Sequence, residues 1–426
     1  MDSEYTRRMK RFNDARFGMF IHWGAYAVPA RGEWVKSIEK LNDAQYQKYI
    51  DAFHPREFDA RAWARYAKEA GMKYAVFTAK HHDGFCMFDS KLTDYKADRD
   101  YVREFLDAFH EEGLMAGLYY SLIDWHHPDY PHYGDRIHPQ RDDPSWQEYP
   151  HDFERYLAYM HGQIRELCEN YGPVDILWTD YSYDNMRCET WKGTGLTEMV
   201  RSLQPDIILN NRLEASGEGF GSLIEEHPDP TSGDFVSPEQ IIPPDGIRNV
   251  KGEPVSWEAC VTMNENWGYC REDRYFKPAS ILIRKLVECV SKGGNLLLNV
   301  GPDEEGRFPE ESVRILKEIG EWMKTNGESV YGCGYSGIPK PEYGRITAGK
   351  NMLYYHLYEG VIGGVPLNGI DRDMIEEICL LKGNRTLQIR SDWITDNYPD
   401  IVFTDLGRDP VLPDPVDTVI RVKLKP

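Results

Sequence analysis

The sequence predicts an α/β protein, with a (β/α)8-like (TIM-type) barrel over residues 1–332 and a C-terminal β-sandwich domain over residues 333–426. Three observations favour this fold class. From about residue 15 to 330, short apolar runs alternate with amphipathic segments, as in β-α units around a parallel sheet. The apolar runs are hydrophobic almost throughout, so both of their faces need cover. After this region, short alternating runs separated by Gly, Pro, Asn and Asp indicate an all-β domain.

Seven strands and five helices are expected in the barrel region. The expected strands are short apolar runs at residues 17–23, 73–79, 114–122, 174–180, 206–211, 255–261 and 295–300. The expected helices have apolar residues at helical spacing and cover residues 58–71, 100–113, 152–172, 276–294 and 310–327. Most of these helices stop at a glycine, which is a common residue just after a helix C-terminus. A closed barrel is the simplest arrangement that covers such strands on both faces.

The last part of the chain has a different pattern. Its expected strands are the alternating runs at residues 352–358, 376–381, 386–393 and 417–425. A long polar segment at residues 215–254, which is rich in Pro and Gly, separates the expected strand at 206–211 from the one at 255–261. Long loops of this kind in a compact enzyme usually carry function, so we expect this segment to contribute to a site.

Composition excludes several classes of partner. The chain has 426 residues and a formal net charge of −20, which argues against nucleic acid or an anionic membrane as a partner and favours a neutral or weakly charged substrate. Its 8 cysteines form no CxxC pair and are expected to be reduced thiols. The N-terminus has no apolar leader, and no run is apolar and long enough to cross a bilayer. We therefore expect a cytoplasmic protein, and a homo-oligomer paired through a sandwich edge or barrel helix is one option.

Polar and aromatic side chains stand where the expected strands end. Because the C-terminal ends of barrel strands meet at one rim, these residues are expected to lie together, and that rim is where barrel enzymes carry their chemistry. A single His, Asn or Asp at such a point is usually a capping or hydrogen-bonding residue, but six strand ends share the pattern. The residues are His22-Trp23-Gly24, Lys80-His81-His82-Asp83, Tyr119-Tyr120, Trp178-Thr179-Asp180, Asn210-Asn211-Arg212 and Trp257-Glu258.

This mixture suits a sugar ligand. Aromatic rings can cover the apolar C–H faces of a sugar, and polar groups can bind its hydroxyls. Cleavage of a glycosidic bond also needs two carboxyl groups, one to attack or activate water and one to protonate the leaving oxygen. Asp180 is the first candidate. Candidates for the second are Glu214, Glu218, Glu225, Glu226, Glu239 and Glu258.

Several motifs resemble glycoside hydrolase family 29, the retaining α-L-fucosidases. They occur in family order from residue 17 to 332, which is about three-quarters of the chain. The motifs are "FGMFIHWGAYAVPARGEWV", "FTAKHHDGFCMFDS", "GLYYSLIDWHHPDY", "ILWTD", "NNR", "GDFVSPEQIIP", "ENWGY", "SKGGNLLLNVGPDEEGRFP" and "IGEWMKTNGESVYG". The resemblance implies a catalytic barrel followed by a β-sandwich, a fucosylated substrate, a covalent fucosyl-enzyme intermediate, and neither a metal nor an organic cofactor.

The resemblance also implies roles for single residues. Asp180 would be the nucleophile and Glu239 the general acid/base, with Arg212 and the histidine pair keeping Asp180 ionised. Tyr181 departs from the family pattern, in which Gly or Met commonly follows the nucleophile, and this departure bears on the leaving group. The residues implied to bind the sugar are His22, Glu33, Trp34, His81, His82, Tyr120, Trp178, Arg212 and Trp267.

Two alternatives remain at this stage. A metal-dependent hydrolase could use the His-rich rim, although no HxH or HExxH spacing supports it and adjacent histidines on an extended segment point apart. A catalytically silent carbohydrate-binding protein is disfavoured because both expected carboxylates are present. The metal alternative would draw its ligands from His81, His82, Asp83, His126, His127, His132 and Asp180.

Overall fold

The seven apolar runs of the barrel region form one parallel sheet. The computed structural model describes residues 3–130, 136–217, 219–407 and 411–426. The strand order is β5-β4-β3-β2-β1-β7-β6, and every neighbouring pair is parallel. The predicted strands are therefore confirmed, with shifted ends. Their bounds are β1 Phe17–Ile21, β2 Tyr74–Lys80, β3 Met115–Ser121, β4 Ile176–Asp180, β5 Ile208–Leu209, β6 Glu258–Thr262 and β7 Asn295–Val300.

An irregular segment spans the gap between β5 and β6 and closes the barrel. Residues 234–240 run between these two strands, joined to them by the isolated parallel bridges Asn210↔Phe235, Val236↔Trp257 and Glu239↔Cys260. Backbone hydrogen bonds reach both sides, from Asp234 N to Leu209 O and from Cys260 N to Pro238 O. We call residues 234–240 the seam. The sequence predicted only a loop here, within 215–254.

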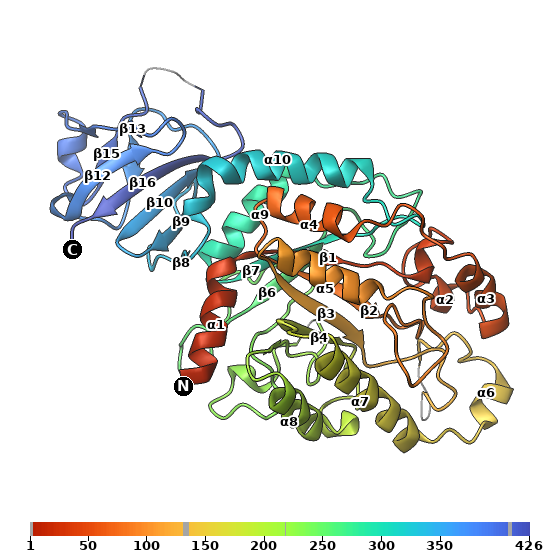
Figure 1. Cartoon of the computed structure of the whole chain (residues 1–426). Coiled ribbons are helices and arrows are strands. Elements are labelled where there is room, and N and C mark those ends of the chain that lie inside the picture. Colours follow the sequence, from red (N-terminus) through yellow and green to blue (C-terminus); the bar gives the residue numbers. More distant parts are fainter. Residues whose placement is uncertain (1–2, 131–135, 218, 408–410) are drawn as a thin grey trace.

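Helices cover the outer face of the sheet (Figure 1). The five predicted helices are present as α4, α5, α7, α9 and α10, and glycines with positive φ follow four of them, at Gly71, Gly113, Gly172 and Gly293. The sequence did not predict α1, α2, α3, α6 or α8; of these, α2 and α6 are short and α1 is rich in charge. The bounds are α1 Ser3–Ala15, α2 Val35–Ile38, α3 Asp43–Asp51, α4 Ala60–Glu69, α5 Tyr101–Glu111, α6 Pro144–Glu148, α7 Phe153–Asn170, α8 Gly193–Leu203, α9 Ala279–Ser291 and α10 Glu310–Asn326. Across the described ranges, no helix combines the length and the apolar character that a membrane span needs.

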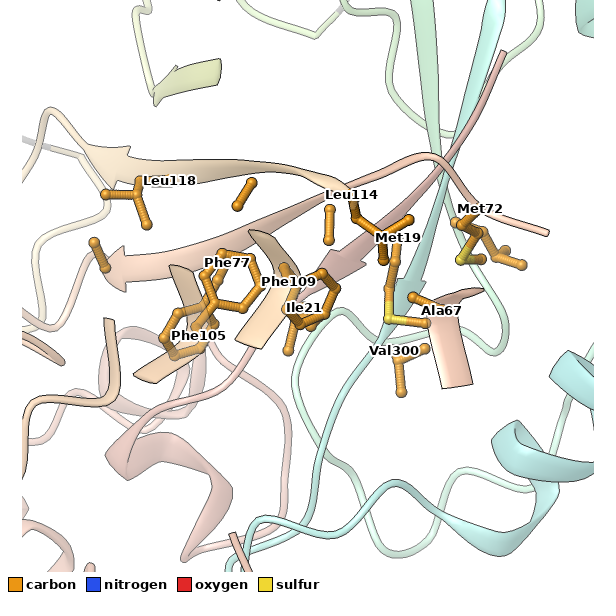
Figure 2. Close-up of a cluster of buried hydrophobic side chains, with 14 of the residues drawn as sticks. Met19, Ile21, Ala67, Met72, Phe77, Phe105, Phe109, Leu114, Leu118 and Val300 are labelled. Carbon is orange, nitrogen blue, oxygen red and sulfur yellow. The ribbon is translucent and has the colours of Figure 1, made fainter. Parts of the chain in front are cut away.

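The main core lies between the strands and the outer helices. Met19 and Ile21 of β1 and Phe77 of β2 point outward into the same buried cluster as Phe105 and Phe109 of α5 (Figure 2). All of these side chains are at most 1% exposed. Burial of apolar side chains on this scale is the dominant favourable term in folding.

A second core fills the barrel itself. Successive strand residues point to opposite faces, so Phe20, Val76 and Trp178 point inward while their neighbours in the chain point outward. From α1, Phe12 packs on Tyr74 and Phe235 at the end of the barrel where the strands begin. The inward residues at the other end of the strands are then free to form a cavity.

The C-terminal region is a β-sandwich, as predicted. A six-stranded sheet of order β13-β12-β16-β10-β9-β8 and a three-stranded sheet of order β11-β15-β14 enclose their own apolar cluster. The first of these strands begins at Gly334, and the predicted domain boundary after residue 332 stays a prediction. The bounds are β8 Gly334–Tyr335, β9 Gly344–Gly349, β10 Met352–Leu357, β11 Val365–Leu367, β12 Ile375–Leu380, β13 Arg385–Thr386, β14 Ile389–Arg390, β15 Val402–Thr404 and β16 Thr418–Leu424.

Candidate active site

A cavity of about 530 Å³ opens at the C-terminal ends of the barrel strands. It contains nine of the eleven site residues predicted from the sequence. These nine are His22, Trp34, His81, His82, Trp178, Asp180, Arg212, Glu239 and Trp267. The two others, Glu33 and Tyr120, do not line it. The cavity is also lined by further residues, including Tyr119, Tyr181, Arg187 and Gln240.

Asp180 is the last residue of β4 and is held from two sides. Its Oδ2 accepts a hydrogen bond of 2.8 Å from the Tyr119 hydroxyl, and its Oδ1 accepts one of 2.8 Å from Arg212 Nη1. The strand behind it, with Leu177 and Trp178 buried, gives the carboxylate little freedom of position. Such a fixed carboxylate is suited to attack at one defined point.

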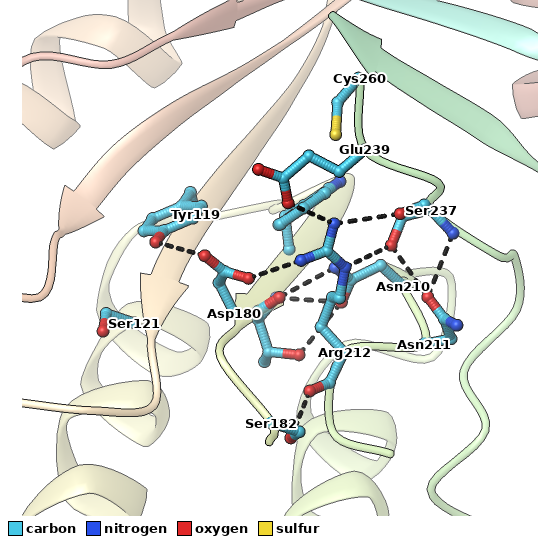
Figure 3. A network of polar contacts seen from close by, with 12 residues as sticks. Tyr119, Ser121, Asp180, Ser182, Asn210, Asn211, Arg212, Ser237, Glu239 and Cys260 are labelled. Carbon is cyan, nitrogen blue, oxygen red and sulfur yellow. Dashed lines mark hydrogen bonds and ion pairs between the residues drawn. The ribbon is translucent and has the colours of Figure 1, made fainter. Parts of the chain in front are cut away.

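Arg212 joins Asp180 to Glu239. Its Nη2 donates to Glu239 Oε2 at 3.1 Å, so one guanidinium group bonds both carboxylates (Figure 3). The Arg212 side chain is 3% exposed, whereas that of Glu239 is 38% exposed. Residues 59 positions apart in the chain thus meet across one planar cation, with the nucleophile candidate 15% exposed and the acid/base candidate more open to solvent.

The guanidinium is itself fixed by neighbouring groups. Its Nε donates to Ser237 Oγ at 2.9 Å, and Nη2 donates to the Ser237 carbonyl at 3.0 Å. The Ser237 hydroxyl donates to Asn211 Oδ1, which ties the seam to the end of β5. The cation also lies over the ring of Trp178, with 4.7 Å between the guanidinium carbon and the ring centroid.

Burial raises the pKa of Asp180 above its usual range. The Arg212 cation opposes this shift, the neighbouring Glu239 carboxylate adds to it, and the Tyr119 hydroxyl opposes it. The sequence predicted that the histidine pair would also help to keep Asp180 charged. That prediction is wrong, because burial lowers the pKa of both His81 and His82 well below the usual value and leaves them neutral.

Two of the histidines present a defined acceptor to the cavity. His22 Nδ1 lies 2.7 Å from Asn299 Oδ1, and the amide nitrogen of Asn299 donates to the Trp267 carbonyl, so Nδ1 of His22 must carry the proton. His82 Nδ1 lies 2.7 Å from Ser121 Oγ, whose own proton goes to the Ile123 carbonyl. In both rings Nε2 is left as an acceptor for a hydroxyl. Burial lowers the pKa of His22 to about 3.

Glu33 supports the cavity wall without lining it. It is 6% exposed, and its Oε2 accepts a hydrogen bond of 2.8 Å from the backbone N–H of Gly268, next to Trp267. Trp267 lines the cavity and packs near Phe20 and His22. Glu33 was predicted to bind the sugar directly. In the structure its carboxylate lies behind the cavity wall and holds the backbone next to Trp267.

The structure contradicts the prediction that Tyr120 faces the ligand. Tyr120 points outward from β3, is fully buried, and donates to Gln163 Oε1 of α7 at 2.7 Å. Its neighbour Tyr119 points inward and bonds Asp180 instead. The two residues alternate across the strand, and because both faces of a barrel strand are apolar the sequence contains no signal to decide between them.

The other candidate carboxylates lie elsewhere. Glu258 is fully buried beneath the cavity, Glu214 accepts from the Ser222 hydroxyl, and Glu226 pairs with Lys251. Glu225 is exposed and does not line the cavity. Glu218 lies outside the described residues. Among the candidates that can be placed, Glu239 is the one that shares the cavity with Asp180.

The chain turns sharply directly after each of the two carboxylate residues. Tyr181 has φ 85° and Gln240 has φ 56°, in the left-handed region that non-glycine residues rarely adopt. Such a conformation costs on the order of 1–3 kcal/mol and is found mainly at functional sites. Tyr181 lines the cavity, with its ring 5.1 Å from His82 and 4.9 Å from Tyr183 between centroids.

The histidines that the structure describes do not form a metal-binding cluster. No group of three or more His, Cys, Asp or Glu side chains is arranged to hold a metal ion in the part of the chain that the structure describes. His126 stacks on Tyr95 with 3.5 Å between centroids, and His127 packs near Tyr159, away from the cavity. His132 lies outside the described residues. The metal-dependent alternative is not favoured by this arrangement.

Comparison with known proteins agrees with the geometry. The α-L-fucosidase family profile matches residues 1–328. Plasma α-L-fucosidase of Homo sapiens is 31% identical over 349 residues, covering 75% of this chain and 68% of that protein. The structure of α-L-fucosidase isoenzyme 1 from Paenibacillus thiaminolyticus is 50% identical, with a TM-score of 0.96 and full coverage of both chains.

A second solved structure is informative about chemistry. It is a GH29 α-L-fucosidase from Bacteroides thetaiotaomicron, trapped as a covalent intermediate with 2-fluoro-fucosyl fluoride in a Glu-to-Gln mutant. It is 30% identical, with a TM-score of 0.83, and the alignment covers 99% of this chain and 96% of that one. The chain described here belongs to the α-L-fucosidase family of glycoside hydrolases, GH29.

Proposed function

We propose that this protein is a retaining α-L-fucosidase in which Asp180 is the nucleophile and Glu239 is the general acid/base. The observation that carries the proposal is the Arg212 guanidinium, which bonds both carboxylates at the mouth of one cavity. Retaining glycosidases need two carboxyl groups about 5 to 5.5 Å apart. A single guanidinium that contacts both is consistent with such a short gap.

In the first step, Asp180 Oδ attacks the anomeric carbon of the fucosyl group. The bond from that carbon to the leaving oxygen breaks, and the leaving oxygen takes a proton from Glu239. Arg212 and the Tyr119 hydroxyl hold the attacking carboxylate in place and balance its charge. The product of this step is a fucosyl ester of Asp180 and a free leaving group.

In the second step, water hydrolyses the ester. Glu239, now ionised, takes a proton from the water as its oxygen attacks the anomeric carbon, and Asp180 leaves. The 38% exposure of the Glu239 side chain fits this step, because the base must meet water from solvent. An acceptor hydroxyl in place of water would give transfucosylation. Two inversions at one carbon return the original configuration.

The cavity wall supports recognition of a neutral deoxy-sugar. His22 and His82 offer Nε2 as acceptors for hydroxyl groups, while Trp34 and Trp267 offer apolar surface. A methyl group and C–H faces need such surface, and the hydroxyls need polar partners. The net charge of −20 also favours a neutral glycan over an anionic one. Cytoplasmic location and a homo-oligomeric state stay predictions, which cell fractionation and light scattering would test.

Active-site labelling tests the proposal directly. Incubation with 2-fluoro-fucosyl fluoride should add one fluorofucosyl group to the peptide that contains Asp180, as seen by mass spectrometry. D180G should lose both the label and turnover of an aryl α-L-fucoside. E239A should be slow, and added azide should restore its rate with a fucosyl azide product of retained configuration.

The matched control is E225Q, which changes an exposed carboxylate in the same polar segment and should behave as the wild type. Label on another peptide, or turnover by D180G above a trace, would show that Asp180 is not the nucleophile. Normal turnover by E239A on a substrate with a poor leaving group would show that Glu239 is not the general acid/base.

A further inference from the structure

Glu258 is a fully buried carboxyl group directly beneath the cavity. It is the first residue of β6, it is 0% exposed, and it does not line the cavity. Its Oε2 accepts a hydrogen bond from the Tyr74 hydroxyl, and its Oε1 accepts one of 3.1 Å from the indole Nε1 of Trp178. The proposed reaction gives this group no role, so its partners must explain its presence.

Trp178 connects this buried carboxyl to the cavity. The same indole that donates to Glu258 lies under the Arg212 guanidinium, 4.7 Å from ring centroid to guanidinium carbon. It also stacks on Tyr119, with 5.9 Å between centroids and an angle of 21° between planes. Tyr119 and Arg212 both hydrogen-bond the Asp180 carboxylate through their side chains. One side chain therefore contacts the buried carboxyl and both of these partners of the nucleophile candidate.

The hydrogen bond to Glu258 affects the indole in two ways. It fixes the rotation of the ring, because the N–H points at one buried acceptor. It also polarises the ring, since a carboxylate that accepts the N–H raises electron density on the indole face and strengthens the attraction of a cation above it. Both effects act on the position of the Arg212 guanidinium.

We propose that Glu258 is a positioning residue of the fucosidase reaction: through the indole of Trp178 it orients the Arg212 guanidinium, which holds Asp180 and Glu239. This inference rests on the proposed function. It extends the site by one buried layer, from the cavity to the hydrogen-bonded pair of Glu258 and Tyr74. Glu258 contacts no substrate and donates no proton in the reaction.

The surroundings of Glu258 support a sensitive link. Tyr74 faces it from β2 and Trp178 faces it from β4, while Cys260 lies near it on β6. On β7, Asn295 Nδ2 lies 3.5 Å from the Tyr74 hydroxyl, and its Oδ1 lies 3.4 Å from Nη1 of Arg16. Burial raises the pKa of Glu258 to about 7. The charge that polarises Trp178 therefore changes in the neutral pH range.

A double-mutant cycle tests the link. The variants are E258Q, which keeps an acceptor but removes the charge, W178F, which keeps a ring but removes the N–H donor, and the double variant. Each single variant should lower kcat for an aryl α-L-fucoside about tenfold, with KM changed less than about twofold. If Glu258 acts through the indole N–H, the double variant should also lose about tenfold and not about a hundredfold.

Two further measurements separate positioning from a general effect on folding. Y120F removes the hydroxyl of another buried tyrosine, which bonds Gln163 and does not line the cavity, and should keep kcat close to the wild-type value even if its Tm falls. The pH profile of kcat in the wild type should contain an ionisation that E258Q lacks. If E258Q does not fold, W178F, Y120F and the wild-type pH profile carry the comparison.

Several results would overturn the proposal. They are wild-type kcat in E258Q with only a lower Tm, fully multiplicative losses in the double variant, or equal losses of kcat in Y120F and W178F. None of these results would affect the roles of Asp180 and Glu239, which the labelling experiment tests separately.

Discussion

Arg212 lies between Asp180 and Glu239 and donates to both, at 2.8 Å to the first and 3.1 Å to the second. This relationship makes the guanidinium the common support of two carboxylates that must act in different protonation states. Its planar set of donors can also bond Ser237 at the same time. A lysine ammonium has no such planar fork.

R212K should therefore lose activity despite keeping its charge. We expect kcat to fall at least about a hundredfold, because a single ammonium cannot hold both carboxylates and Ser237 in place. Steady-state kinetics on an aryl α-L-fucoside measures this, with circular dichroism to verify folding. R165K, at an exposed position on α7, is the control and should match the wild type. Activity within about threefold of the wild type in R212K would contradict this view of the site.

Y119F and Y120F form a matched pair that tests which tyrosine serves the site. Y119F removes a hydrogen bond to Asp180 Oδ2 that opposes the rise in its pKa, so the acidic limb of kcat/KM should move to higher pH and kcat should fall about tenfold.

Y120F should leave the kinetics unchanged and cost about 1 kcal/mol of stability, because it removes only the bond to Gln163. The measurements are pH–rate profiles and denaturant unfolding of both variants. The reverse pattern, with a kinetic defect in Y120F alone, would show that Tyr120, and not Tyr119, serves the active site.

Stability should depend on the charge of Glu258. Its pKa is about 7 in the folded protein against 4.5 for an exposed glutamate, so the folded state binds the proton more tightly than the unfolded state. The stabilisation is then complete below about pH 4.5 and is lost as pH rises through about 7.

E258Q lacks this dependence. Between pH 4 and pH 8, its free energy of unfolding should improve relative to the wild type by an amount on the order of 3 kcal/mol. Urea unfolding at several pH values measures the difference. Parallel curves for the two proteins would mean that Glu258 keeps an ordinary pKa.

A buried pair in the sandwich should affect stability and not catalysis. His356 Nδ1 lies 2.7 Å from Asp417 Oδ2, and both side chains are 0% exposed. H356A leaves the carboxyl without its partner, which should cost about 3–5 kcal/mol. The kcat per folded molecule should stay at the wild-type value, because neither residue lines the cavity. H151A, at a more exposed position, is the control for loss of a histidine.

Much of the fold could be predicted because barrel strands are simple apolar runs. Residues 174–180 and 295–300 each contain three consecutive large apolar residues, at 176–178 and 296–298, and stand out from their surroundings. Helices α1 and α8 were missed for physical reasons. The first is rich in charged residues, and the second has Gly193 and Gly195 in its first turn, where glycine lowers helix propensity.

The candidate site could be predicted from the residues that follow the strands. Asp180 and Arg212 stand at strand ends, and parallel strands deliver such residues to one rim. Two features could not be predicted. The choice between Tyr119 and Tyr120 depends on which face of β3 is inward, and both faces are apolar. The seam directly follows Gly233 and contains Pro238, residues that weaken a strand pattern in a sequence.

The two carboxylates differ in how firmly the backbone holds them, because Glu239 lies in the seam and Asp180 lies on β4. Asp180 ends a strand that is hydrogen-bonded in register along its length, whereas Glu239 sits in a stretch secured by single bridges. Local opening should thus cost less around Glu239 than around Asp180. The proton donor could be re-sited by grafting a loop of different length into this stretch, with the nucleophile left untouched. Redesign of the enzyme for new leaving groups should therefore begin with the seam.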